Sequence, residues 1–134
     1  MKKNGVLNAP LSRLIASLGH TNRLVICDCG LPIPRHAEVV DLALAKNIPK
    51  FMQALNVILE EFNVEEAIIA EEMLSKSNGL FEEVSAVLPG INIKKVSHEE
   101  FKKITKEDSD TVFVRTGEAT PYANIILVSG VTFG

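Results

Sequence analysis

The chain has 134 residues, of which 46% are apolar, and this length and composition suit one domain with a sizeable core. A formal charge of -3 gives no electrostatic footprint for nucleic acid, and the scattered Lys and Arg residues do not suit an anionic membrane surface. No apolar run approaches the roughly 18 residues that span a bilayer, and Pro10 and Arg13 interrupt the N-terminal segment, so we expect neither a membrane span nor a signal peptide.

The first predicted element is a helix with Asn8 or Ala9 as its N-cap, because apolar residues then recur with helical spacing on one face. Gly19 stands where a C-cap glycine would end this helix. An apolar strand is predicted over residues 24–27 and, after a proline-rich loop, a short strand over residues 39–44.

Farther along the chain, apolar strands alternate with helical patterns. We expect helices from Pro49, over residues 75–88 and over residues 97–106, and strands over residues 67–70, 91–96, 111–115 and 124–128. Ser97 and Glu100 form the pattern of a capping box at the start of the last helix. The alternation predicts an α/β fold: a single three-layer α/β/α domain over residues 1–134 with a mostly parallel central sheet.

Titratable side chains flank the first predicted strand at both ends. Asp28 follows the strand directly, at the end where ligands collect in α/β sheets, although it could equally cap the turn at Gly30. His20 follows a helix C-terminus, whose dipole favours the protonated imidazole and so suits an acid, and the alternative is a solvated histidine.

Two later segments also carry chemistry. His98 stands in the first turn of the last helix, where the dipole favours the neutral, hydrogen-bond-accepting form, unless it is simply an exposed residue there. Tyr122, the only tyrosine, combines an aromatic face with a hydroxyl, and Asn124 both donates and accepts, which together suit a sugar. An ordinary turn between two strands is the alternative for this segment.

Several other kinds of site are poorly supported. Cys27 and Cys29 lack the spacing of a zinc site, and two residues on one strand are badly placed to bridge, so we expect free thiols. A cysteine nucleophile beside His20 lacks any sign of an oxyanion hole. Neither a P-loop nor the glycine fingerprint of dinucleotide-binding folds is present, so neither a metal nor a nucleotide cofactor is indicated.

Short motifs along the whole chain match one family in order. They are Gly5-Val6-Leu7-Asn8, Leu18-Gly19-His20, Asp28-x-Gly30-Leu31-Pro32, Ser97-His98-Glu99-Glu100-Phe101, Arg115-Thr116-Gly117-Glu118 and Pro121-Tyr122-Ala123-Asn124. On these residues the chain resembles the ribose pyranase and L-fucose mutarotase family. The glycine and leucine after Cys29, and the alanine at position 123, resemble the ribose branch more than the fucose branch.

The resemblance implies an isomerase that interconverts the pyranose and furanose forms of D-ribose by acid–base ring opening and reclosure. It implies His20 as the catalytic proton donor, and as sugar-binding residues Asp28, His98, Tyr122, Ala123 (through its backbone) and Asn124. It further implies a cytoplasmic, metal-free protein that assembles as a decamer of two stacked pentamers, with sites built at subunit contacts. An L-fucose-type mutarotase and a non-catalytic sugar-binding module are the alternative functions.

Overall fold

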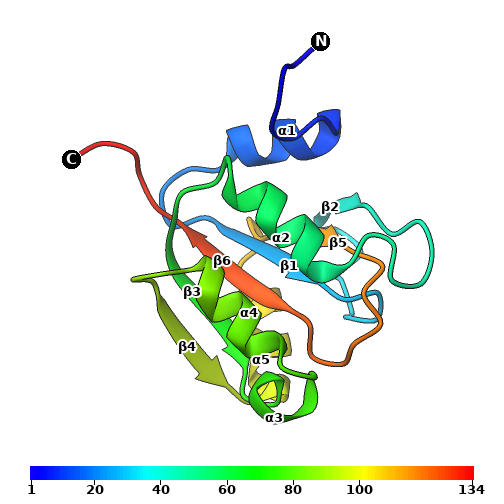
Figure 1. The fold of residues 1–134 in the computed structure, drawn as a ribbon. Helices are drawn as coiled ribbons and strands as arrows, with labels where there is room; N and C mark the ends of the chain where they lie inside the picture. Colours follow the sequence, from blue (N-terminus) through cyan, green and yellow to red (C-terminus); the bar gives the residue numbers. More distant parts are fainter.

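A six-stranded sheet in the order β2-β5-β1-β6-β3-β4 organises the computed structural model, which describes residues 1–134 (Figure 1). The strands are β1 (Arg23–Cys27), β2 (Glu38–Asp41), β3 (Val64–Ala70), β4 (Asn92–Val96), β5 (Val112–Arg115) and β6 (Ile125–Ser129). β6 pairs antiparallel with both β1 and β3, whereas the other neighbouring pairs are parallel. The predicted mostly parallel sheet is therefore confirmed, with one reversed strand at its centre.

Helices cover both faces of this sheet. They are α1 (Ala9–Ser17), α2 (Phe51–Leu59), α3 (Met73–Lys76), α4 (Leu80–Val87) and α5 (His98–Glu107). The first four pack on one face, with apolar side chains in the larger core, and α5 lies behind the sheet on the other face (Figure 1). The predicted three-layer α/β/α arrangement is thus confirmed, and no helix combines the length and hydropathy needed to cross a membrane.

The alternation of side chains along β1 explains how one strand serves two cores. Leu24 and Ile26 point into the larger core, whereas Val25 and Cys27 point into the smaller core beneath Phe101 of α5. These four residues of β1 are fully buried, as a strand covered on both faces should be. Asp28 directly follows the buried carboxyl end of this strand, and His20 lies three residues before its first residue.

Two sequence-based predictions at helix ends are wrong. The helix predicted over residues 75–88 is two helices, because Asn78 and Gly79 adopt left-handed backbone conformations with φ of 52° and 77° and end the first one. Gly19 is not a left-handed C-cap: Leu18 ends α1 in an extended conformation, and the positive φ of 68° belongs to Thr21. The caps predicted at Asn8 and Ser97 do accept backbone hydrogen bonds from Leu11 and Glu100.

Candidate active site

A cavity of about 450 Å³ opens beyond the carboxyl end of β1. Its lining includes Asp28 at the end of β1, His98 and Lys102 on α5, and Tyr122 before β6. The turn after Asp28 and Pro121 complete the wall. Three residues predicted from separate parts of the sequence therefore meet here, at the sheet end where α/β folds bind ligands.

Asp28 is held in this cavity by hydrogen bonds on both carboxylate oxygens. Oδ1 accepts from the backbone N–H of Gly30 at 2.9 Å, and Oδ2 accepts from Nδ2 of Asn124 at 3.2 Å. Asn124 also accepts from the backbone N–H of Asp28 at 2.8 Å, and it is only 1% exposed. Burial raises the pKa of Asp28, while these hydrogen bonds and the charge of His98 oppose the rise.

Asp28 therefore caps the turn at Gly30, which was one of its two predicted roles, and it also lines the cavity. Asn124 stands behind the cavity wall, where its amide positions Asp28. Ala123 is fully buried beside it and does not line the cavity. The segment that carries Tyr122 thus supplies one ring to the cavity and one buried amide to the carboxylate.

The imidazole of His98 contacts the ring of Tyr122 in the cavity wall. The two rings meet edge to face, with centroids 5.0 Å apart and planes at 83°, and the ring of Phe101 lies nearly parallel to the imidazole with centroids 6.4 Å apart. The backbone N–H of His98, one of the first in α5, donates to both carboxylate oxygens of Glu72 at 3.1 and 3.2 Å. Nδ1 of His98 is buried and has no hydrogen-bond partner within the chain.

The segment that precedes Tyr122 is fixed by buried hydrogen bonds. The hydroxyl of Thr116 donates to the carbonyl that ends β1 at 2.8 Å, and the carboxylate of Glu118 accepts from the backbone N–H of Phe51 at 2.9 Å. Burial raises the pKa of Glu118, but hydrogen bonds from Phe51 and Thr120 outweigh this effect and lower it. Glu118 thereby ties the start of α2 to the loop that carries the cavity tyrosine.

His20 lies at the opposite end of β1, away from this cavity. A strand of five residues is about 16 Å long, so the two ends of β1 do not meet within one chain. Nε2 of His20 contacts Oε2 of Glu65 at 2.9 Å, and the two side chains are 51% and 42% exposed. Within one chain, the carboxylate beside His20 therefore belongs to Glu65 and not to Asp28.

The residues predicted from the sequence did not include Lys102, Glu65 or Glu72. Lys102 follows His98 by four residues, so helical spacing alone would have placed both on one face of α5. Glu65 and Glu72 lie in acidic stretches without a local pattern, and only the fold brings them to His20 and His98.

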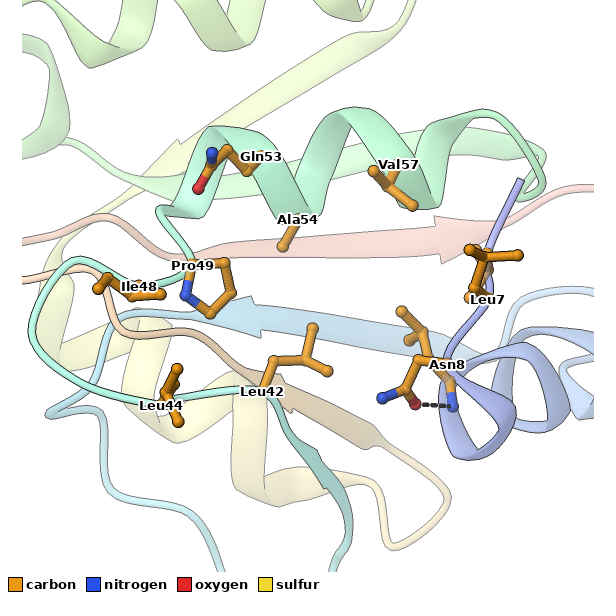
Figure 2. Close-up of a pocket in the computed structure, with 11 residues that line it drawn as sticks. Leu7, Asn8, Leu42, Leu44, Ile48, Pro49, Gln53, Ala54 and Val57 are labelled. Atoms are coloured by element: carbon orange, nitrogen blue, oxygen red, sulfur yellow. Dashed lines mark hydrogen bonds between the residues drawn. The ribbon is translucent and has the colours of Figure 1, made fainter. Parts of the chain in front are cut away.

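The largest cavity, about 580 Å³, is an apolar groove between α2, the N-terminal segment and the loop before α2 (Figure 2). Its two polar side chains are already engaged: Asn8 accepts from the backbone of Leu11, and Gln53 accepts from the backbone of Lys50. Because the lining holds no titratable side chain, the groove offers no acid–base chemistry.

The cysteines and carboxylates form no further centre. Cys27 and Cys29 are free thiols, and burial raises the pKa of Cys27 to about 12. No three His, Cys, Asp or Glu side chains are grouped in a way that could hold a metal ion.

Known proteins are similar to this chain in both sequence and fold. Residues 1–132 match the RbsD / FucU transport protein family. The D-ribose pyranase of Coprothermobacter proteolyticus is 55% identical over 133 residues, covering 99% of this chain and 100% of that protein. The D-ribose pyranase of Geobacillus thermodenitrificans is 50% identical, with 99% of each chain covered. The structure of Bacillus subtilis RbsD complexed with D-ribose is 42% identical and superposes with a TM-score of 0.92, covering 99% of this chain and 100% of that chain.

Proposed function

The chain belongs to the RbsD / FucU transport protein family, and on this basis we propose that it is an isomerase that interconverts the pyranose and furanose forms of D-ribose. The cavity at the end of β1 is the observation that carries the proposal. It brings a half-buried carboxylate, an imidazole with an unpaired nitrogen and a tyrosine ring together around a space of about 450 Å³.

Each side chain of the cavity has a use in holding a pentose. The carboxylate of Asp28 accepts hydrogen bonds from sugar hydroxyls, the imidazole of His98 supplies a further polar contact, and the ring of Tyr122 covers an apolar face of the sugar. Ala123 and Asn124 stand directly behind Tyr122. Asn124 acts on the sugar through its hydrogen bonds to Asp28, and its second amide N–H and the Ala123 backbone are assigned to the sugar by resemblance.

The catalytic acid in this proposal is His20 of a second copy of the chain. His20 cannot reach the cavity of its own chain, because β1 separates the two. A neighbouring copy that places its His20 against this cavity completes the site. This arrangement supports self-association as a ring homo-oligomer, for which we propose the decamer of two pentamers implied by the family resemblance.

The reaction needs one proton donor and one acceptor in each direction. His20 protonates the ring oxygen as the bond from that oxygen to the anomeric carbon breaks, and Asp28 takes the proton of the anomeric hydroxyl. Reclosure through a different hydroxyl returns both protons, so the reaction has no net proton change. General acid–base catalysis of this kind contributes roughly a hundred- to ten-thousand-fold. The reaction uses no cofactor, and a cytoplasmic location would suit a sugar substrate met after uptake.

Proton NMR with saturation transfer between the anomeric signals of D-ribose tests the proposal. Wild-type protein should accelerate pyranose–furanose exchange of D-ribose more than any exchange of L-fucose, and His20→Ala should abolish the acceleration while D-ribose still binds. Unchanged exchange in His20→Ala would contradict the assignment of the acid. Binding without acceleration by the wild type would instead identify a sugar-binding module. Sedimentation analysis of the 14.6 kDa chain tests the decamer.

A further inference from the structure

The contact between His20 and Glu65 is placed by an irregularity in the sheet. β3 pairs with β6 through Val64 opposite Ser129 and Glu66 opposite Val128, so Glu65 is an extra residue without a partner on β6. Such a β-bulge redirects one side chain, and bulges are frequent next to active sites. Here the redirected carboxylate reaches Nε2 of His20 at 2.9 Å.

The backbone around His20 is also fixed. The N–H of Thr21 donates to the carbonyl of Ser129 at 2.8 Å, and the N–H of Ser129 donates to the carbonyl of Asn22 at 2.8 Å. The side chain of Asn22 accepts from the backbone of Gly19 at 2.7 Å, which closes the turn. The turn and the bulge both contact Ser129 at the end of β6, so the backbone segments that carry the imidazole and the carboxylate are joined through this residue.

We propose that Glu65 is the positioning residue for His20, an inference that rests on the proposed function of His20 as the catalytic acid. With Nε2 engaged by the carboxylate of Glu65, Nδ1 is the nitrogen that gives its proton to the ring oxygen of the sugar. On reclosure the attacking hydroxyl returns a proton to Nδ1, and the proton on Nε2 stays in the contact with Glu65 throughout. The carboxylate fixes the ring orientation and faces the positive charge of the imidazolium.

This role predicts a particular kinetic signature. Glu65 contacts His20 and is not assigned any contact with the sugar, so its loss should reduce kcat and leave sugar binding unchanged. We expect Glu65→Ala to lower kcat about tenfold or more, within the range of general acid–base catalysis, with KM and the Kd of D-ribose changed less than about twofold. Glu65→Gln keeps an acceptor for Nε2 without the charge, so its kcat should lie between those of Glu65→Ala and the wild type.

The matched control is Glu66→Ala, the neighbouring glutamate, whose side chain makes no hydrogen bond or ion pair in the structure. It should retain the wild-type kcat. Exchange rates are measured by saturation-transfer NMR over a range of D-ribose concentrations, Kd by calorimetry, and assembly size by sedimentation. If Glu65→Ala changes the assembly size, the kcat of Glu65→Gln is the measurement that tests the proposal.

The inference is overturned if both Glu65 variants keep the wild-type kcat, if Glu66→Ala loses as much as Glu65→Ala, or if the loss lies in KM. The proposed function has its own readout in His20→Ala. An inactive His20→Ala together with wild-type Glu65 variants would refute only the role of Glu65. An active His20→Ala would refute the proposed acid, and the role of Glu65 with it.

Discussion

The paired hydrogen bonds between Asp28 and Asn124 make Asn124→Asp a sharp test of the electrostatics of the cavity. The substituted side chain has nearly the same size, and one of its oxygens can still accept from the backbone N–H of Asp28, 2.8 Å away in the wild type. The other position changes from an N–H donor to a carboxylate oxygen, 3.2 Å from Oδ2 of Asp28. A fully buried carboxylate would then lie beside the half-buried carboxylate of Asp28.

The expected loss of stability follows from comparing two states of this pair of carboxyl groups, one with both ionised and one with a single proton bound. Two unit charges 3.2 Å apart repel by about 5 kcal/mol at an effective dielectric constant of about 20. Holding one proton on a carboxyl of ordinary pKa 3.8 costs about 4 kcal/mol at pH 7, at about 1.4 kcal/mol for each pH unit. Protonation is the smaller cost, so we expect the pair to share a proton and the variant to lose about 4 kcal/mol at pH 7.

The loss should depend on pH with a defined sign. In the variant the folded pKa of the pair lies above 3.8, so stability relative to the wild type is kept below that value and lost as pH rises through the raised pKa. Near pH 4.5 the cost falls to about 1 kcal/mol.

Urea unfolding of both proteins near pH 4.5 and pH 7, at one fixed protomer concentration, measures the difference. Asn124→Ala is the control, because it removes the hydrogen bonds without adding a charge. Since the Asn124 amide lowers the pKa of Asp28, the cost of this control should also rise with pH, but by less than the cost of Asn124→Asp. An Asn124→Asp penalty that is equal at the two pH values would refute the geometry on which the argument rests.

Three further substitutions test the supports of the site. Glu72→Ala removes the acceptor of the His98 backbone N–H and should raise the Kd of D-ribose about two- to tenfold by calorimetry, whereas Glu71→Ala should not. Gly117→Ala should destabilise the fold by roughly 1–3 kcal/mol or more in urea, because its Cβ would lie 2.3 Å from a backbone oxygen of the loop before α2. Glu118→Gln should be less stable than the wild type above pH 4.5, and the gap should shrink as pH falls through the lowered pKa of Glu118; a constant gap would contradict the hydrogen bonds assigned to it.

The sequence predicted those features that depend on residues close together in the chain. Runs of apolar residues predict buried strands such as β1. The caps at Asn8 and Ser97 are predictable because each side chain accepts a hydrogen bond from the backbone N–H three residues ahead. The break between α3 and α4 could also have been predicted, because Asn78-Gly79 is a typical turn dipeptide. The helical spacing of apolar residues on either side of it led instead to the prediction of one continuous helix.

Contacts between residues far apart in the sequence were harder to predict. His20 and Asp28 are eight positions apart in the sequence, yet β1 runs between them and holds them at its opposite ends. The residue that does reach His20 is Glu65, and it does so through a bulge that shows only when β3 is aligned with β6. Register between distant strands is set by the packed sheet, which a local pattern does not encode.

The position of β6 has a consequence for how the chain is made. It is the last strand in chain order, yet it lies between β1 and β3 and alone joins β2-β5-β1 to β3-β4. During synthesis at about 5–20 residues per second, both groups of strands emerge before the strand that joins them. For seconds the nascent chain therefore presents two open strand edges that other chains could pair with. Final closure of the sheet has to wait until β6 has left the ribosome.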